Sequence, residues 1–289
     1  MSCTGWRCCW PVKRFRGLLA PKWPENILGS IDKSKAKKGE LLYGELCAGC
    51  HLPAVTSDAF WSDKYWKEIP GGKGKYLKVK LFDVGYMGTD PAQADVLPNR
   101  MVEVPSILGV TEPNVQGNGL ICGGKEGTST NKNLFAWALA DVTQKTIYNW
   151  YDKHNISPEM REEMNGNRPN CVHAPKKYKA RPLNGIWATA PFLHNGSVLT
   201  LDDLLKPASE RPDTICLGAN AYDPVKVGFE GDTDFLGSCP SGTFKLDATV
   251  AGNLNEGHSF EEGEKGKGII GRKLSDAERS AIIEYLKTL

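Results

Sequence analysis

The sequence predicts an all-α fold with long loop insertions. Residues 32–47, 131–153 and 275–289 carry apolar side chains at helical spacing. Long stretches between them lack periodicity, and 31 Gly and 18 Pro residues indicate extended, irregular loops there. A chain of 289 residues is long enough to bury a substantial core. We expect an irregular segment over residues 1–30 and one domain over residues 31–289.

The first helix is predicted to begin with Asp32 or Ser34 as its N-cap and to run to Cys47. Its apolar face is formed by Leu41, Leu42 and Leu46. Residues 76–84 alternate between apolar and charged side chains, which predicts a short strand and leaves room for one two-stranded ribbon.

The second helix is predicted over residues 131–153, followed by a short helix at residues 201–206. Residues 208–273 are expected to contain little regular structure. Ser275 and Glu278 have the spacing of a capping box, so the last helix begins there. We expect this last helix to pack across the first.

The charge and hydropathy of the chain exclude some classes of partner. The formal net charge of +2 is too small to indicate binding to nucleic acid. No run of 18 apolar residues occurs, so we expect no membrane span. The basic segments 64–80 and 176–181 are most simply solvated surfaces, with the docking of an acidic partner as the alternative.

Residues 47–51 have the sequence Cys-Ala-Gly-Cys-His. On a helical turn, residues three and four positions apart share a face, so both thiols and the imidazole point the same way. The thiols can then add to the two vinyl groups of haem while the imidazole binds the iron. This pattern is typical of c-type haem attachment. The sequence therefore predicts one haem c, attached through Cys47 and Cys50, with His51 as an iron ligand.

Chance, a redox pair and a zinc site each fit the motif less well than haem attachment does. Nine Cys and five His residues would yield it by chance on the order of once in a few hundred such chains. A thioredoxin-like pair needs a βαβ setting, and a zinc site needs a second pair of Cys or His at ligand spacing. Neither is visible in the sequence. One or two disulfides are expected among four further cysteines, with the pairing open: Cys122, Cys171, Cys216 and Cys239.

The residue pattern leaves the second iron ligand open. His258 lies in a loop rich in Gly and Asn, which lets the backbone approach a flat ligand, although a loop histidine is by default solvated. His194 lies between apolar residues and a turn, where it can bind a haem propionate, the backbone or iron. The remaining candidates are Met87, Met101, His154, Met160, Met164 and His173.

Residues 178–198 resemble the core motif of the dihaem cytochrome c peroxidase superfamily. The similarity is greatest to its rubber-oxygenase-like branch, secreted dihaem enzymes that cleave polyisoprene. The resemblance extends over residues 21–289. Further matching segments are residues 88–91, 223–229, 252–258 and 283–289.

The resemblance covers the carboxy-terminal haem domain of that branch, a cytochrome c-like fold. There the haem is bound by two histidines and relays electrons, while the other domain meets peroxide or oxygen. It implies His51 and His258 as iron ligands and His194 beside the haem edge, with no catalytic residue in this chain. Only 46 residues precede Cys47 and the motif occurs once, so electron transfer is the expected function. The alternatives are a part of a dihaem peroxidase or oxygenase, and a haem sensor.

The expected partner is a redox protein or an upstream haem domain. Covalent haem attachment normally requires export, so we expect a periplasmic or secreted protein. Residues 1–19 do not form a signal peptide, because their basic residues precede only a very short apolar stretch. We therefore expect this chain to be the downstream part of a longer exported protein.

Overall fold

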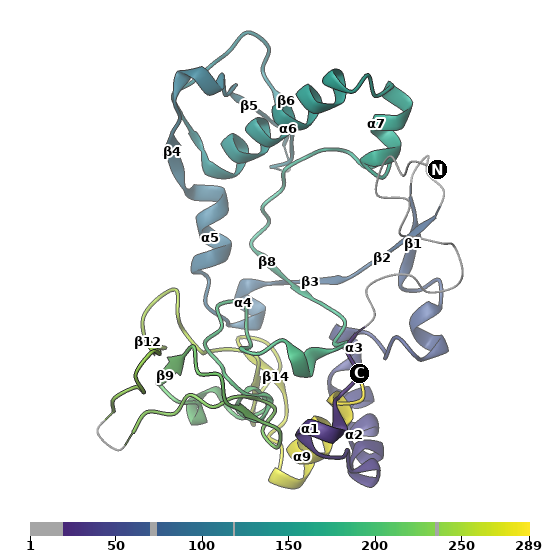
Figure 1. The fold of residues 1–289 in the computed structure, drawn as a ribbon, viewed down its shortest axis with the longest axis vertical. Helices are drawn as coiled ribbons and strands as arrows, with labels where there is room; N and C mark the ends of the chain where they lie inside the picture. The colour runs from purple at the N-terminus through teal and green to yellow at the C-terminus, as the bar shows by residue number, and fades with distance from the viewer. Residues whose placement is uncertain (1–19, 70–73, 118, 235–236) are drawn as a thin grey trace.

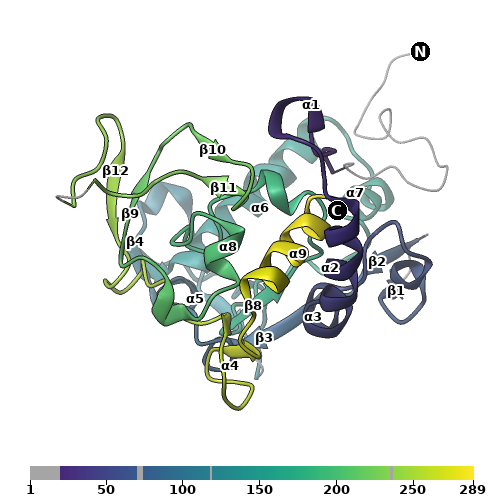
Figure 2. The ribbon, with the colours of Figure 1, turned by 90° about the horizontal axis from the view of Figure 1, so that it is seen from below.

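The computed structural model describes residues 20–69, 74–117, 119–234 and 237–289. Most of the segment predicted as irregular, residues 1–19, lies outside the described residues. Figure 1 shows two lobes joined by the strands β3 and β8. We call residues 92–172 the upper lobe. The lower lobe contains both ends of the described chain, with the first helices and the last helix side by side (Figures 1 and 2).

The helices are short except for two. They are α1 (Glu25–Leu28), α2 (Lys33–Leu46), α3 (Ala48–His51), α4 (Val84–Met87), α5 (Ala92–Asn99), α6 (Phe135–Lys153), α7 (Pro158–Met164), α8 (Leu201–Leu204) and α9 (Asp276–Leu286). Single 3-10 turns cover Asp58–Trp61, Ser106–Leu108, Ile186–Ala188 and Ala208–Glu210.

The prediction of an all-α fold is wrong, because the described residues also form seven two-stranded sheets. Their strands are β1 (Trp66–Glu68), β2 (Lys75–Leu77), β3 (Lys80–Asp83), β4 (Met101–Glu103), β5 (Pro113–Val115), β6 (Ile121–Gly124), β7 (Lys132–Leu134), β8 (Lys177–Ala180), β9 (Thr214–Leu217), β10 (Tyr222–Asp223), β11 (Gly228–Phe229), β12 (Phe244–Asp247), β13 (Ser259–Phe260) and β14 (Ile269–Gly271).

These strands leave little trace in the sequence for a physical reason. Each has two to four residues, too few for the alternation of apolar and polar side chains to be visible. Several pair with distant segments, as β3 does with β8 and β9 with β12, so no hairpin turn announces them. The strand expected over residues 76–84 is in fact split between β2 and β3, which have different partners. Residues 208–273, expected to be irregular, contain β9 to β14.

The helical predictions are confirmed with small shifts. Asp32 caps α2 by accepting from the backbone N–H groups of Ser34 and Lys35, and Ser275 and Glu278 form the predicted capping box of α9. The predicted helix over 131–153 begins only at Phe135, because residues 132–134 pair with β4 instead. The short helix ends at Leu204. In the described part of the chain, no helix has both the length and the hydropathy to cross a bilayer.

The packing of α2 across α9 is confirmed and forms the centre of the lower lobe (Figure 2). The contact does not use the predicted leucine face, since Leu41 remains 75% exposed. It uses Gly39 and Tyr43 of α2, and the rings of Tyr43 and Tyr285 lie 5.2 Å apart. A Cβ added at Gly39 would lie only 1.9 Å from the backbone oxygen of Ala281. The close approach of the two helices therefore requires a glycine.

The upper lobe has its own core, in which α6 packs on short strands. Its buried residues are Val104, Val110, Ile121, Trp137 and Ala138. A disulfide between Cys122 and Cys171 closes this lobe next to β8. A second disulfide joins Cys216 to Cys239 in the lower lobe, so the four expected cysteines form two bonds.

We predict that Gly39→Ala destabilises the protein by about 1–3 kcal/mol, because the added methyl group forces α2 away from α9. Gly44→Ala on the same helix is the matched control. Nothing lies within 4 Å of a Cβ at Gly44, so alanine there should be neutral or stabilising by up to about 1 kcal/mol. Thermal unfolding followed by circular dichroism measures both. Equal effects of the two variants would contradict the packing described.

Candidate functional site

The Cys47–His51 motif forms the turn between α2 and α3. Cys47 ends α2 and caps α3, and the N–H groups of Cys50 and His51 both donate to its carbonyl oxygen, at 3.0 and 2.9 Å. Leu52, directly after the motif, is fully buried, and its carbonyl oxygen accepts a hydrogen bond of 2.7 Å from the Tyr43 hydroxyl. The α2–α9 core therefore holds both ends of the motif.

Both cysteines of the motif are free thiols. Burial, with the neighbouring Cys50, raises the pKa of Cys47 to about 12. Burial also raises the pKa of Cys50, although the charges of Lys80 and Lys265 oppose this. A redox-active pair needs a thiol whose pKa is lowered. The thiols here are neutral at physiological pH, which disfavours the thioredoxin-like alternative.

The ring of His51 is oriented by β8. Its Nδ1 lies 2.7 Å from the carbonyl oxygen of Arg181, the residue after this strand, and donates to it. Burial lowers the pKa of His51, although this carbonyl acts in the opposite direction. The imidazole is therefore neutral, with its proton on Nδ1. Its Nε2 lone pair is left available for a metal.

His258 lies beside His51 although the two are far apart in the sequence. Their ring centres are 6.2 Å apart, with the rings inclined by 65°. Burial lowers the pKa of His258 to about 3, with the charges of His51 and Arg211 adding to this effect. Its Nδ1 is shielded from solvent and has no hydrogen-bond partner in the described structure. His258 is thus a neutral imidazole brought to the motif.

The backbone brings His258 to this position through a crossing of three glycines. A Cβ at Gly257 would lie 2.4 Å from the carbonyl oxygen of Met87, and one at Gly88 would lie 2.6 Å from the Cα of Gly268. The N–H of His258 donates to Met87 at 3.2 Å. His258 itself has a left-handed φ of 46°, which is uncommon for a residue with a side chain. The surrounding contacts hold this strained conformation.

Asp90 fastens the loop that precedes His258. One carboxylate oxygen accepts from the backbone N–H groups of Gly252 and Leu254, at 2.6 and 3.1 Å, and the other accepts from Ala92 at 2.7 Å. Burial alone would raise the pKa of Asp90, yet these three amides and His194 hold it below its usual value. Asp90 is only 1% exposed. It is therefore an ionised carboxylate enclosed by the loop.

His194 lies against the same loop but is arranged differently. Its ring stacks on Tyr178 with the centres 4.3 Å apart, and the Tyr178 hydroxyl donates to the Asp90 carbonyl oxygen at 2.8 Å. The neighbouring Asn195 donates to the Leu254 carbonyl oxygen at 2.9 Å. The Nε2 of His194 is buried and has no hydrogen-bond partner in the described structure. It is a polar atom that a ligand can satisfy.

The remaining candidate iron ligands are not brought to the motif. His154 stacks on Trp150 in the upper lobe at 4.2 Å, and His173 is exposed. Met87 contributes its backbone to the glycine crossing. The other three methionines, Met101, Met160 and Met164, are exposed.

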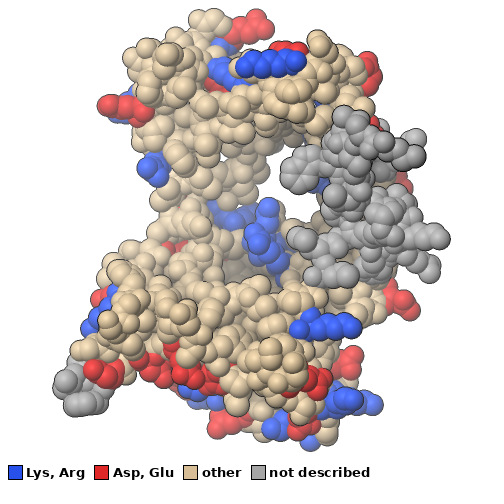
Figure 3. Space-filling view, in the orientation of Figure 1, with Lys and Arg blue, Asp and Glu red and all other residues tan. Residues whose placement is uncertain are grey.

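The basic segments predicted as solvated surfaces are partly neutralised. Lys75 pairs with Asp63, and Lys177 pairs with Asp83. Lys80 instead donates to the carbonyl oxygen of Gly49 within the motif. Figure 3 shows Lys and Arg side chains gathered around the hollow between the lobes. Positive charge therefore lies close to the motif as well as on the outer surface.

Comparisons with known proteins agree with this site. Residues 177–215 match the model of the RoxA-like, cytochrome c-like family. This segment contains β8, which orients His51, and also His194 and Arg211. The expected resemblance to the rubber-oxygenase-like branch is confirmed. A cytochrome c-like domain implies haem c as its cofactor.

Two proteins of Sinorhizobium fredii (strain NBRC 101917 / NGR234) are similar over most of the chain. The uncharacterized protein y4iJ is 45% identical over 277 residues, which cover 95% of this chain and 42% of y4iJ. The uncharacterized protein y4iM is 40% identical over 279 residues, which cover 89% of this chain and 49% of y4iM. The chain thus spans less than half the length of either relative.

We predict that Gly257→Ala destabilises the protein by about 1–3 kcal/mol more than Gly252→Ala does. Both glycines have a positive φ, so alanine strains the backbone at both positions. Only at Gly257 does the methyl group also collide with a neighbouring backbone. Chemical denaturation of the two variants gives the difference, and a smaller loss for Gly257→Ala would contradict the crossing.

Proposed function

We propose that this chain is an electron-transfer cytochrome that carries one haem c, attached through Cys47 and Cys50, with His51 and His258 as the two iron ligands. The observation that carries the proposal is the distance of 6.2 Å between the two imidazole ring centres. An imidazole nitrogen binds a metal ion at about 2 Å and lies about 1 Å from its ring centre. Two rings on opposite sides of one ion therefore have centres roughly 6 Å apart.

The donor chemistry of the site supports this assignment. Both imidazoles are neutral, and the hydrogen bond from His51 to the Arg181 carbonyl fixes its tautomer and orientation, as is usual for a metal-bound histidine. Cys47 and Cys50 are unpaired neutral thiols three positions apart. When bound, haem iron supplies a one-electron couple whose potential depends on its axial ligands and its surroundings.

Electron transfer is favoured over catalysis because two histidines fill both axial positions. Catalysis at haem iron requires a position that oxygen or peroxide can occupy. Asp90 and the glycine crossing hold His258 on a rigid loop, which disfavours its dissociation. The same rigidity keeps structural change small when the charge on the iron changes, as an electron relay requires.

The alternative is that this chain forms the electron-relay part of a larger dihaem peroxidase or oxygenase. It is favoured by the length of the relatives, more than twice that of the matched region. In both cases the role of His51 and His258 is the same. Absorption spectra of the ferric protein with and without cyanide separate an iron site that is itself closed from one that is open.

His194 is the proposed partner of a haem propionate. Its buried Nε2 lacks a hydrogen-bond partner in the described structure, and the adjacent Tyr178 and Asp90 hold its ring in place. A propionate oxygen would accept a hydrogen bond from this nitrogen.

An oxidising compartment outside the cytosol is the proposed location. Covalent haem attachment normally requires export. The two disulfides, Cys122–Cys171 and Cys216–Cys239, form readily in such a compartment. The proposed partner is a redox protein or a further haem domain.

We predict that combining Cys47→Ala with Cys50→Ala abolishes covalent haem, because no thiol remains to form either thioether bond. Haem staining of a denaturing gel measures this. The control combines Cys216→Ala with Cys239→Ala, which removes a disulfide at a cost of about 2–5 kcal/mol but leaves both motif thiols intact. Persistent haem staining in the first double variant would refute the attachment.

We predict that His258→Ala keeps the covalent haem but converts the ferric iron from low-spin to high-spin, since one axial ligand is lost. The visible absorption spectrum reports this change, and cyanide should now bind. His154→Ala, which changes an exposed histidine of the upper lobe, is the control and should leave the spectrum unchanged. A low-spin spectrum for His258→Ala that cyanide does not alter would exclude His258 as the ligand.

A further inference from the structure

Arg211 is buried directly behind the loop that carries His258. It is 5% exposed. One guanidinium nitrogen donates to the carbonyl oxygens of Asn255 and Gly257, at 2.5 and 2.8 Å, and another donates to that of His258 at 2.9 Å. A single side chain thus holds three carbonyl groups within four consecutive residues.

The opposite side of the guanidinium is bound to the segment around α8. Its Nε donates to the carbonyl oxygen of Asp203 at 3.2 Å, and Nη2 contacts the carbonyl oxygen of Leu204 at 3.3 Å. Arginine has five donors in a rigid planar fork, whereas lysine has three on a flexible stem. Arg211 therefore ties the α8 segment to the His258 loop in a way that lysine cannot reproduce.

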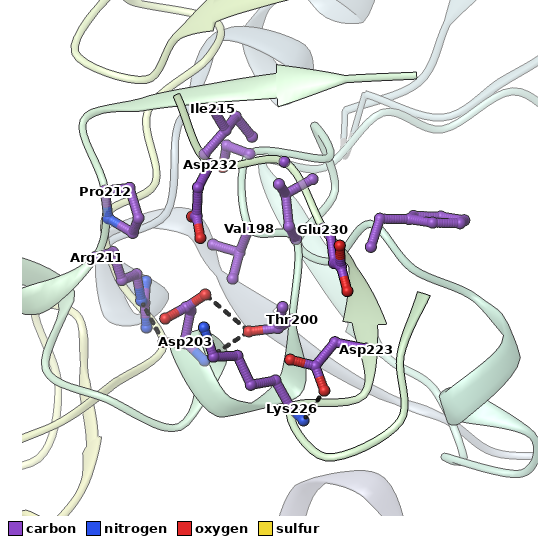
Figure 4. Close-up of a pocket in the computed structure, with 14 residues that line it drawn as sticks. Val198, Thr200, Asp203, Arg211, Pro212, Ile215, Asp223, Lys226, Glu230 and Asp232 are labelled. Carbon is purple, nitrogen blue, oxygen red and sulfur yellow. Dashed lines mark hydrogen bonds between the residues drawn. The ribbon is translucent and has the colours of Figure 1, made fainter. Parts of the chain in front are cut away.

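The charge of Arg211 is only weakly compensated. Asp203 and Glu261 are the carboxylates whose charges act on it, yet the Asp203 carboxylate pairs with Lys206 at 2.7 Å and accepts from the Thr200 hydroxyl at 2.7 Å. Figure 4 shows Asp203 between Thr200 and Arg211 at the wall of a small pocket. Burial lowers the pKa of Arg211 to about 10, so it stays protonated at neutral pH.

We propose that Arg211 positions His258 and, as a buried cation behind this ligand, raises the reduction potential of the haem. The inference rests on the proposed ligation by His51 and His258. A fixed positive charge in a medium of low dielectric constant destabilises the ferric state more than the ferrous state, because the ferric site carries one more positive charge. The potential is therefore set partly by a residue that does not touch the iron.

The test compares variants of the haem-loaded protein by spectroelectrochemical titration. Arg211→Met removes the charge and the donors, and should shift the ferric–ferrous equilibrium about tenfold toward ferric, a fall of about 59 mV. Arg211→Lys keeps the charge, so its potential should stay closer to that of the wild type. Because lysine loses contacts to the loop carbonyls, the ferric iron of Arg211→Lys should nevertheless bind cyanide more readily.

Arg279→Gln is the matched control. Arg279 is also largely buried, but it pairs with Asp202 at 3.1 Å and with Asp276 at 2.8 Å, so its charge is neutralised locally. Its removal should leave the potential near that of the wild type. An equal fall in Arg279→Gln and Arg211→Met, or no fall in Arg211→Met, would overturn the proposal. So would Arg211→Lys having a potential as low as that of Arg211→Met.

Two further measurements keep the outcome decisive. If Arg211→Met does not fold, Glu261→Gln carries the test, because removing this negative charge leaves Arg211 less compensated and should raise the potential. An unchanged potential there would overturn the role of Arg211. The spectrum of His258→Ala tests the ligation itself, so an unaltered potential in Arg211→Met together with a high-spin His258→Ala would refute only the inference about Arg211.

Discussion

The site depends on the close crossing of backbone at Gly88, Gly257 and Gly268. No side chain fits between these segments, and the crossing brings His258 to a motif that lies far away in the sequence. Asp90 and Arg211 then bind the loop from either side, one with carboxylate oxygens on amides and the other with a guanidinium on carbonyls. Peptide dipoles satisfied by buried charges hold the backbone of His258 in its left-handed conformation.

The cytochrome c-like part of the fold could be predicted because its determinants are local. The capping box at Ser275, the N-cap at Asp32 and the pentapeptide at residues 47–51 each specify their structure within a few positions. The strands could not be predicted, because a strand of two to four residues with a distant partner has no local pattern. The extra segments between α3 and α9 are stabilised by such pairings and by two disulfides, which is why an all-α fold was expected.

The candidate site was predicted unevenly for the same reason. Cys47, Cys50 and His51 follow from one motif, whereas His258 and His194 were singled out by the resemblance to a family and not by their own spacing. Asp90 lies in a segment that also carried the resemblance, but its role became visible only with the Gly252 and Leu254 amides. Arg211 had no signal in the sequence, since a lone arginine in a loop is ordinarily exposed.

The central claim is that two imidazoles from distant parts of the chain lie on opposite sides of a single haem iron. Electron paramagnetic resonance of the purified ferric protein tests it most directly. We expect low-spin signals typical of iron with two nitrogen ligands, with no high-spin component, and no change on addition of cyanide. A dominant high-spin ferric signal in the wild-type protein would contradict the claim.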